Sequence, residues 1–597
     1  MTKERMAVRA GEGHGVAIGL LRRAGLYWHT ARHLRWEQVV YRPLRQVQHR
    51  LPLRLPAGGE AAEERFPALA AAVAAWGPDD AAARLARARE VAAGRFTFLG
   101  RTKALEPVDW TRRHGSHLWS YHLQYFGYGV DLAWAWRLTG EARFARRFAA
   151  LAEGWMHAAR PGAGDAWQPY PVSVRIVSWT HALLLFGDAL DGRFRRRLLE
   201  SLHAQAAYLE RRLERHVLAN HLQRNLAALV TVGLLFRGAA PERWLRRGAA
   251  RLWREVAEQV LPDGGHYERS PMYHAIAAGD LLEVMALMNA AGVRVPGAVR
   301  ARVAAMVRAL GVLARPDGTL HLFNDAAHDA APSRGYLAAL AARVVDARPE
   351  DPRGAFALPR AGFYGWADPE RGERLVIDAG EPGPAYQPGH AHCGLLGFEL
   401  DLAGAPFAVD AGLSGYAGDP LREYVRSTRA HNTVQIAGLE QSEVWGTFRM
   451  ARRARLLDAS HAEAEGGYRF EGAYRPYHDP AAAHRRTVTR DGAGWRIADR
   501  VEGAAGAPVA SFLHLHPDWR VEAEGTAFVA RRGEAAVRIE PFGGDAVRVA
   551  VGEREPAQGW YCPRLGTAVP APVLVLAIER NDGRECGWTF RVLSPDP

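Results

Sequence analysis

The sequence predicts a multidomain protein in which a helical N-terminal half is followed by an antiparallel β half. Through roughly the first 350 residues, apolar side chains recur at three- and four-residue spacing, which is typical of amphipathic helices. From about residue 355 onward, short runs of Val, Ile, Leu and Phe alternate with polar residues and glycine turns, which is typical of strands. A chain of 597 residues with 48% hydrophobic content can bury the cores of two or more large domains.

The helical half divides into segments such as residues 129–139 and 194–216. Gly- and Pro-rich breaks fall at residues 161–164, 238–241, 292–297 and 315–318. Successive helices with short loops indicate a bundle, a solenoid or a toroid, and the absence of a fixed repeat period disfavours a simple repeat array. A linker is expected at residues 349–354. Strand-like segments follow it at residues 374–378, 396–402, 433–436, 486–490 and 573–578.

The net positive charge favours an anionic binding partner. Lys and Arg exceed Asp and Glu by 12, and the isoelectric point is near 9.8. A basic surface suits an acidic polysaccharide, a nucleic acid or acidic lipid, although an Arg-rich composition alone produces the same excess. No nucleic-acid-binding module or dense Lys/Arg run is present, so we expect no nucleic-acid partner. The three cysteines, Cys393, Cys562 and Cys586, are far apart and predict no disulfide framework.

The N-terminus carries a short apolar run at residues 15–21. The run is too short to span a membrane, and no small-residue cleavage site follows it. We therefore expect a soluble, uncleaved, cytoplasmic chain without a membrane partner, and we leave export by another route open. The sequence does not predict an oligomeric state.

Three segments supply the group types of an acid/base site. Asn220 and His221 open a predicted helix, Tyr273 follows a Ser-Pro pair at another helix start, and His390 lies in a Gly- and His-rich stretch. Removing a proton from a carbon beside a carboxylate requires a group that neutralises the carboxylate, a base and an acid. Amide, imidazole and phenol side chains can fill these roles, so these four residues are the candidate catalytic set.

Each candidate also has an ordinary structural interpretation. Asn220 follows a predicted helix end, and Asn is a common helix cap. His221 can be a hydrogen-bonded structural histidine, and Tyr267 competes with Tyr273 as the phenol of the site.

Aromatic and basic side chains near these segments predict a sugar-binding surface, because aromatic rings stack on sugars and Arg can bind carboxylate or sulfate. About half of these rings are expected to pack between helices instead. The candidate substrate-binding residues are Tyr121, His122, Trp167, Arg175, Arg224, Tyr267 and Arg269.

The β half carries a candidate metal site. His390 and His392 have the two-residue spacing that places both imidazoles on one face of a strand. With Asp410 and His431 downstream, one carboxylate and two imidazoles would suit Zn²⁺, with Mn²⁺ as an alternative. His514 and His516 are a rival pair with the same spacing.

Taken in order and spacing, these segments resemble the heparinase II/III-like polysaccharide lyases. The resemblance covers most of the chain and rests on residues 94–100, 118–126, 167–179, 220–225, 264–274, 323–325, 390–394 and 426–433.

The resemblance implies an incomplete (α/α) toroid at residues 76–355. A helical segment at 1–75 would pack on the toroid, and a two-layered antiparallel β-sheet domain would follow at 356–597. The active site would lie in a canyon between toroid and sheets. The implied reaction is β-elimination of uronate-containing glycans: heparan sulfate or heparin, hyaluronan, chondroitin sulfate or bacterial acidic polysaccharide.

Carried over residue by residue, the family's carboxylate-neutralising Asn falls on Asn220, with His221 beside it. The Tyr acid/base falls on Tyr273 and the catalytic His of the β domain on His390. The family's structural metal site would fall on His392, Asp410 and His431, three of the residues whose spacing already suggested a metal site.

Two other functions remain as alternatives. One is a non-catalytic protein that binds acidic glycans in exopolysaccharide biosynthesis. The other is a glycoside hydrolase, which would need two carboxylates about 5–10 Å apart across the scissile bond. The acids available near the motifs are Glu268, Asp280 and Asp325.

Overall fold

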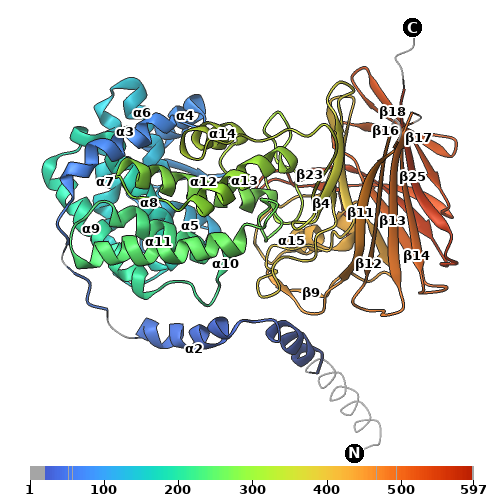
Figure 1. Cartoon of the computed structure of the whole chain (residues 1–597), viewed down its shortest axis with the longest axis horizontal. Coiled ribbons are helices and arrows are strands. Elements are labelled where there is room, and N and C mark those ends of the chain that lie inside the picture. Colours follow the sequence, from blue (N-terminus) through green and yellow to red (C-terminus); the bar gives the residue numbers. More distant parts are fainter. Residues whose placement is uncertain (1–20, 51–52, 57, 465–466, 493, 594–597) are drawn as a thin grey trace, which may run out of the picture.

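The computed structural model confirms the predicted fold class, a helical domain followed by an antiparallel β domain (Figure 1). It describes residues 21–50, 53–56, 58–464, 467–492 and 494–593. The predicted apolar run at 15–21 lies outside these ranges except for Leu21. The last helix of the helical domain ends at Val344, and the first strand of the β domain begins at Gly354. No helix in the described ranges is both long and apolar enough to cross a membrane.

Three inner helices form the centre of the toroid: α8 (Pro169–Phe186), α10 (Ala219–Gly233) and α12 (Pro271–Ala290). They are buried along most of their length because α10 packs against both α8 and α12 and against the outer helix α11 (Ala239–Gln259). Helices that are buried along most of their length need neighbours on every side. The remaining helices of this domain are α3 (Phe66–Trp76), α4 (Ala81–Ala92), α5 (His117–Tyr125), α6 (Gly127–Thr139), α7 (Ala142–Ala158), α9 (Gly192–Arg211), α13 (Gly297–Leu313) and α14 (Arg334–Val344).

An N-terminal arm runs beneath both domains (Figure 1). It comprises helical residues 21–31 and helix α2 (Trp36–Arg50). The Gln38 side-chain amide is buried and donates to Val217 O of the toroid at 3.4 Å and to Tyr386 O of the β domain at 3.1 Å. The arm therefore contacts both halves of the molecule.

A hairpin of the toroid reaches the β domain on another side. It consists of β1 (Arg95–Phe98) and β2 (Arg101–Ala104), joined at Leu99 and Gly100. Its turn lies so close to Gly566 that a Cβ atom there would come within 2.1 Å of Leu99 O. Gly566 has a φ of +78°, so both its conformation and its contact favour glycine.

The β domain contains three main antiparallel sheets. The five-stranded sheet has the order β3 (Gly354–Leu358), β4 (Phe363–Asp368), β5 (Glu373–Asp378), β6 (Gly397–Leu402), β7 (Ala405–Ala408). The eight-stranded sheet has the order β11 (Arg455–Ala464), β12 (Gly467–Arg475), β13 (Ala483–Asp491), β14 (Gly494–Glu502), β25 (Glu585–Leu593), β18 (Ala535–Phe542), β17 (Ala527–Arg532), β16 (Arg520–Glu524). The four-stranded sheet has the order β19 (Ala546–Val551), β24 (Pro572–Ile578), β15 (Val509–His514), β8 (Val434–Ile436).

Short elements complete this domain. They are helix α15 (Pro420–Arg426) and strands β9 (Val444–Trp445), β10 (Arg449–Met450), β20 (Glu553–Arg554), β21 (Ala557–Gln558), β22 (Trp560–Tyr561) and β23 (Val569–Pro570).

The sheets share one apolar core. Trp366 of the five-stranded sheet meets Trp495 of the eight-stranded sheet edge to face, with ring centroids 5.7 Å apart. The buried Arg486 side chain on β13 adds an ion pair and a hydrogen bond to this core. It binds Asp499 through Nε at 2.7 Å and Nη2 at 2.9 Å, and it donates to Leu396 O at 2.6 Å. The guanidinium therefore connects the large sheet to the loop before β6.

Arg486→Met should lower the free energy of unfolding by about 3–5 kcal/mol, because it leaves the buried Asp499 charge without its main partner. Chemical denaturation of the purified protein measures the change. Arg485 is the matched control, since its side chain is 47% exposed and pairs with Glu502. Arg485→Met should cost less than about 1 kcal/mol. Equal effects of the two substitutions would contradict this account.

Candidate active site

A cavity of about 1120 Å³ lies between the toroid and the β domain. Helices α5, α8, α10 and α12 line it from the toroid, and the loops around residues 387–390, 414–421 and 565–568 line it from the β domain. All four candidate catalytic residues, Asn220, His221, Tyr273 and His390, are among its lining side chains. The structure thus brings together groups that are 170 positions apart at the extremes of the set.

Asn220 stands at the start of α10 but does not cap it. The N-cap position is Leu218, which makes no side-chain cap bond, so the helix-cap interpretation of Asn220 is wrong. Leu218 has φ 67° and ψ −151°, and Ala219 has φ 54°. Consecutive left-handed residues other than glycine are strained, and such strain is typical of segments that hold a functional side chain in place.

A buried carboxylate, that of Glu268, connects Asn220 to His390. Glu268 Oε1 accepts from Asn220 N at 3.1 Å and from Asn220 Nδ2 at 2.9 Å. Its Oε2 meets His390 Nδ1 in a short hydrogen bond. Burial would raise the pKa of Glu268, but its interactions with His390 and Asn220 outweigh burial and lower the pKa to about 2. An ionised Glu268 therefore fixes His390 with Nδ1 protonated and leaves Nε2 for a substrate.

Tyr273 packs face to face on His390, with ring centroids 3.7 Å apart and an interplanar angle of 12°. Ser270 caps α12 by accepting from Tyr273 N at 3.2 Å, which places the tyrosine in the first helical turn. The Tyr273 hydroxyl is 2.7 Å from the hydroxyl of Tyr416. Burial raises the pKa of Tyr273 well above its usual value, so the phenol is neutral and can donate a proton.

His221 forms a second imidazole–carboxylate pair. Its Nδ1 lies 3.1 Å from Glu214 Oε1, and its ring packs against Tyr170 at 4.5 Å. Asn225 holds Glu214 in turn, by donating to Glu214 Oε2 at 3.1 Å and accepting from Glu214 N at 2.9 Å. Burial would lower the pKa of His221, but Glu214 outweighs burial and raises it. A protonated His221 would present Nε2–H to the cavity.

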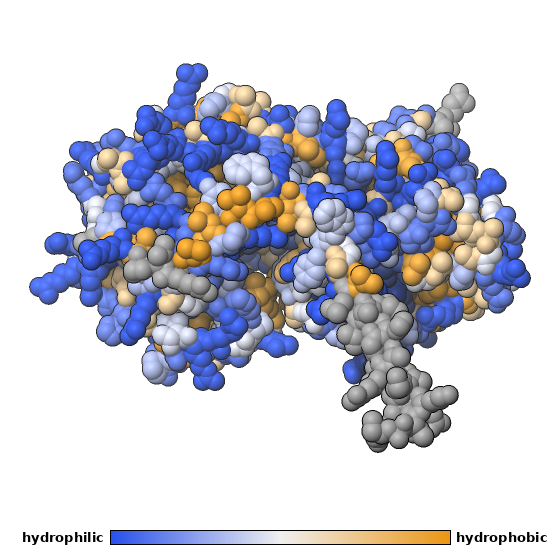
Figure 2. Space-filling model, turned by 90° about the horizontal axis from the view of Figure 1, so that it is seen from below, coloured by the Kyte–Doolittle hydropathy of each residue, from blue (hydrophilic) through white to orange (hydrophobic). Residues whose placement is uncertain are grey.

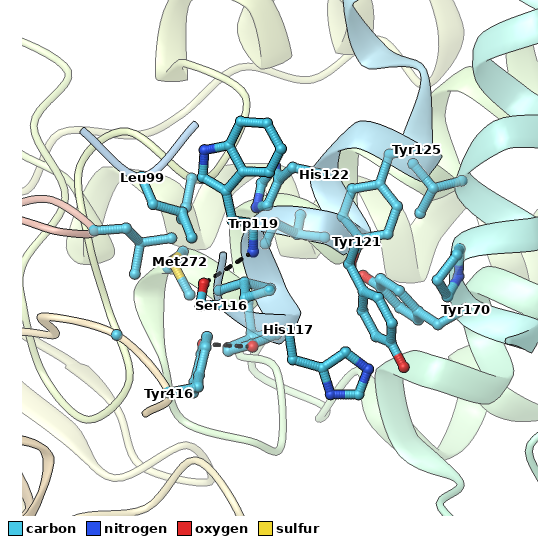
Figure 3. A pocket seen from close by; sticks show the side chains of 18 of the residues that line it. Leu99, Ser116, His117, Trp119, Tyr121, His122, Tyr125, Tyr170, Met272 and Tyr416 are labelled. Atoms are coloured by element: carbon cyan, nitrogen blue, oxygen red, sulfur yellow. Dashed lines mark hydrogen bonds between the residues drawn. The ribbon is translucent and has the colours of Figure 1, made fainter. Parts of the chain in front are cut away.

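Aromatic rings line the side of the cavity next to His221. Figure 3 shows Tyr121, Tyr125 and Tyr170 together on one side, with Tyr416 across from them. His122 also lines the cavity and stacks on Phe98 of the hairpin at 5.6 Å. Of the predicted substrate-binding residues, Tyr121 and His122 thus lie where a sugar ring could contact them.

Arg224 lines the cavity as predicted, but its guanidinium already forms a short ion pair with Asp280. The pair is largely buried, with side-chain exposures of 18% and 6%. Any contact of Arg224 with an anionic sugar would therefore be shared with Asp280.

Four predicted substrate-binding residues lie outside the cavity, which corrects their assignment. Arg175 is fully buried, donates to Gln205 Oε1 at 2.8 Å and stacks over Trp155, because its position on α8 faces the toroid core. Trp167 is buried and donates to Ala159 O at 3.2 Å. Tyr267 bonds Tyr386 through the two hydroxyls at 2.9 Å. Arg269 donates to the β-domain carbonyls of Ala361 at 3.0 Å and Gly383 at 3.2 Å.

Two of the predicted metal ligands, His431 and Asp410, bond each other, and the third, His392, bonds Asp325. His392 Nε2 lies 2.8 Å from Asp325 Oδ1, and His431 Nδ1 lies 2.7 Å from Asp410 Oδ2. Within the described ranges, no group of three His, Cys, Asp or Glu side chains is arranged to hold a metal ion. His392 Nδ1 and His431 Nε2 are nevertheless buried without hydrogen-bond partners, on rings 5.4 Å apart. The rival His514 is buried and bonds Arg429 O at 3.0 Å.

Sequence reasoning missed Glu214 and Tyr416 and gave Glu268 no role in the site apart from the hydrolase alternative. Glu268 lies in the same motif as Tyr273, two positions before Ser270, which is a signal that could have placed it near the site. Glu214 and Tyr416 carry no such signal. Their partners are His221 and Tyr273, and the pairing with Tyr416 spans 143 positions.

Glu214→Gln should lower the pKa of His221, because the carboxylate is what raises it against burial. The His221 signal in an NMR titration of histidine-labelled protein should then lose its proton at a lower pH than in the wild type. His221→Gln assigns the signal. Glu210→Gln is the control, since Glu210 pairs with Arg243 and should leave the His221 titration unchanged. An unchanged titration in Glu214→Gln would refute the pairing.

Comparisons with known proteins agree with this architecture. The family model for the heparinase II/III N-terminus matches residues 92–342, and the model for the heparinase II/III-like C-terminal region matches residues 350–589. A heparin-sulfate lyase of Pedobacter heparinus is 28% identical over 437 residues, which cover 61% of this chain and 64% of that protein. The match therefore spans less than two thirds of the length of this relative.

Solved structures share the fold at low sequence identity. A crystal structure of heparinase III superposes with a TM-score of 0.67 at 18% identity, covering 82% of this chain and 80% of the other. A mutant of the heparan sulfate lyase HepC from Pedobacter heparinus gives a TM-score of 0.60 at 20% identity, covering 86% and 84%. The two family matches together extend over most of both domains. The chain belongs to the heparinase II/III-like family.

Proposed function

We propose that the protein is a polysaccharide lyase that cleaves uronate-containing acidic glycans by β-elimination. One observation carries the proposal. Glu268 fixes Asn220 of the toroid and His390 of the β domain at the same cavity, with Tyr273 stacked on His390. Membership of the family and similarity to a protein named heparin-sulfate lyase support it.

The reaction begins with the uronate carboxylate, whose negative charge opposes removal of the neighbouring C5 proton. We assign its stabilisation to Asn220 and His221. Glu214 raises the pKa of His221, and in its protonated form the imidazole can donate Nε2–H to the carboxylate. Asn220 lines the cavity while Glu268 is 1% exposed behind it, so the amide separates the substrate from the Glu268 charge.

His390 and Tyr273 then share the proton transfers. His390, oriented by Glu268, takes the C5 proton at Nε2, as a carboxylate-oriented imidazole does in other enzymes. The neutral phenol of Tyr273 protonates O4 as the C4–O4 bond breaks. The products are a C4–C5 double bond on the uronate and a free hydroxyl on the departing sugar. Tyr416 holds the Tyr273 hydroxyl in position.

The substrate class follows from the cavity. Aromatic rings of Tyr121, Tyr125 and Tyr170 offer stacking surfaces for sugar rings. We expect heparan sulfate or heparin, hyaluronan, chondroitin sulfate or a bacterial acidic polysaccharide, and heparan sulfate is the first to test because of the named relative. The cytoplasmic location expected from the sequence stays a prediction.

A glycoside hydrolase fits the site less well, because each of its three candidate acids is already bonded to other side chains. Glu268 binds Asn220 and His390, and Asp280 pairs with Arg224. Asp325 is fully buried and binds Arg422 at 3.0 Å.

We also propose that His392, Asp410 and His431 hold a structural divalent cation, Zn²⁺ or else Mn²⁺. The two unpartnered buried imidazole nitrogens and the Asp410 carboxylate beside His431 are the donor types that Zn²⁺ prefers. Bound there, the ion would stabilise the β domain next to His390.

The reaction is tested by incubating purified protein with each candidate polymer and following the ultraviolet absorbance of unsaturated uronate. A rise on one polymer supports elimination and identifies the substrate. Binding on a glycan array without any rise would support the non-catalytic alternative in exopolysaccharide biosynthesis. New reducing ends without unsaturation would indicate hydrolysis.

Tyr273→Phe should lower the elimination rate by at least about 10²-fold, because it removes the acid that protonates O4. Tyr267→Phe is the matched control, since Tyr267 lies outside the cavity and bonds Tyr386. The control should keep most of the wild-type rate. Full activity of Tyr273→Phe, or a large loss in Tyr267→Phe alone, would move the acid role to another residue.

His392→Ala should reduce the content of bound divalent cation and lower the melting temperature, because it removes one proposed ligand. Elemental analysis of the purified protein and thermal unfolding with and without a chelator provide the readouts. His516→Ala, from the rival pair, should leave both unchanged. A wild-type protein that carries no cation and melts identically in chelator would contradict the metal proposal.

A further inference from the structure

The N-terminal arm has two distinct faces. Side chains of α2 at three- and four-residue spacing point to the protein. Gln38 bonds both domains, Tyr41 meets Arg215, and Arg45 lines the cavity and contacts Gln168. In addition, Trp445 of the β domain donates to Thr30 Oγ1 at 3.0 Å. These contacts fix the orientation of the arm, so its opposite face is held toward solvent.

The outer face of the arm is strongly apolar. Along α2 it presents Trp36 at 68% exposure, Val40 at 50% and Val47 at 54%. Trp28, in the preceding helical residues, is 69% exposed. Eight of the fifteen exposed large hydrophobic side chains in the described ranges lie between residues 21 and 47. Figure 2 shows a band of hydrophobic residues along part of this face, with smaller hydrophobic patches elsewhere on it. A concentration of this kind marks an interaction surface.

Positive charge is concentrated on the same segment. The first 50 residues contain ten Lys or Arg and three Glu, a net charge of +7 out of +12 for the whole chain. On the described part of the arm, Arg22, Arg23, Arg32 and Arg42 are exposed. This segment also lies outside the regions matched by the two family models, which begin at residue 92. The charged, apolar arm therefore lies outside both matched family regions.

We infer that the outer face of the arm binds the surface of an anionic lipid bilayer. Tryptophan and aliphatic side chains enter the boundary between headgroups and acyl chains, and flanking arginines attract acidic headgroups. This mode needs no membrane-spanning segment, so it is compatible with the short apolar run at residues 15–21 that led us to expect no membrane partner. The polar inner face, which in a free interfacial helix would meet water, is here covered by the two domains. The arm would thus hold the cavity close to the membrane. The inference does not depend on the proposed lyase activity.

Sedimentation of the full-length protein with vesicles tests the inference. Vesicles of phosphatidylcholine alone are compared with vesicles that also contain phosphatidylglycerol. The protein should sediment with the anionic vesicles, and added salt should weaken binding. The combined substitution Trp28→Ser, Trp36→Ser and Val40→Ser should reduce binding by at least about tenfold. Val549, Val551 and Val592 are exposed on the β domain, and their replacement by Ser is the matched control that should bind like the wild type.

Several outcomes would overturn the inference. These are no binding of the wild type to either vesicle, equal binding of the arm variant and the control, or a dimer in light scattering that the arm variant dissociates. The last result would identify a second copy as the occupant of the outer face. Circular dichroism and thermal melting check that each variant folds. If the arm variant is unfolded, Arg22→Gln with Arg23→Gln keeps the apolar face and should still weaken binding to the anionic vesicles.

Discussion

The arrangement of the site depends on the buried carboxylate of Glu268. A buried charge is costly unless several hydrogen bonds compensate it, and here the partners are the two groups that the proposed reaction needs. Asn220 reaches it from the toroid and His390 from the β domain. Because one ionised side chain binds both, the domains must be docked for the site to form. The strained backbone at Leu218 and Ala219 immediately precedes Asn220 and helps to hold it where its amide reaches Glu268.

Neighbouring side chains keep the domains docked around Glu268. The next residue, Arg269, donates to carbonyls of the β domain, and Ser270 Oγ donates to Asp325 O at 2.5 Å. Asp325 N in turn donates to His390 O at 3.0 Å. Glu268 and Arg269 therefore bond the β domain directly, and Ser270 is linked to His390 through Asp325. Arg269, expected to bind substrate, is instead one of the residues that allow the cavity to exist.

The fold and part of the site could be predicted because their signals are local. Helix and strand periodicities change near residue 355, and the structure passes there from a mainly helical domain to a mainly β domain, apart from the hairpin β1–β2 and the short helix α15. Asn220, Tyr273 and His390 lie in short motifs with helix starts and turns that project side chains. By contrast, Arg175 and Trp167 lie in an aromatic stretch whose pattern is the same whether a side chain faces the core or the cavity. The inner helix α8 buries most of its residues, and only packing shows that Arg175 points away from the cavity. The pairing of Tyr416 with Tyr273 depends on contacts between domains, which no sequence window contains.

The central claim is that Glu268 acts by orienting His390 and Asn220, and the turnover of Glu268→Gln tests it most directly. An amide at this position can donate to Nδ1 of His390 and so favour the tautomer that cannot take a proton at Nε2. The account predicts that kcat on the cleaved polymer falls by about 10²-fold or more, while KM changes little and the melting temperature stays within a few degrees. Activity close to that of the wild type, or a loss explained entirely by unfolding, would contradict the account.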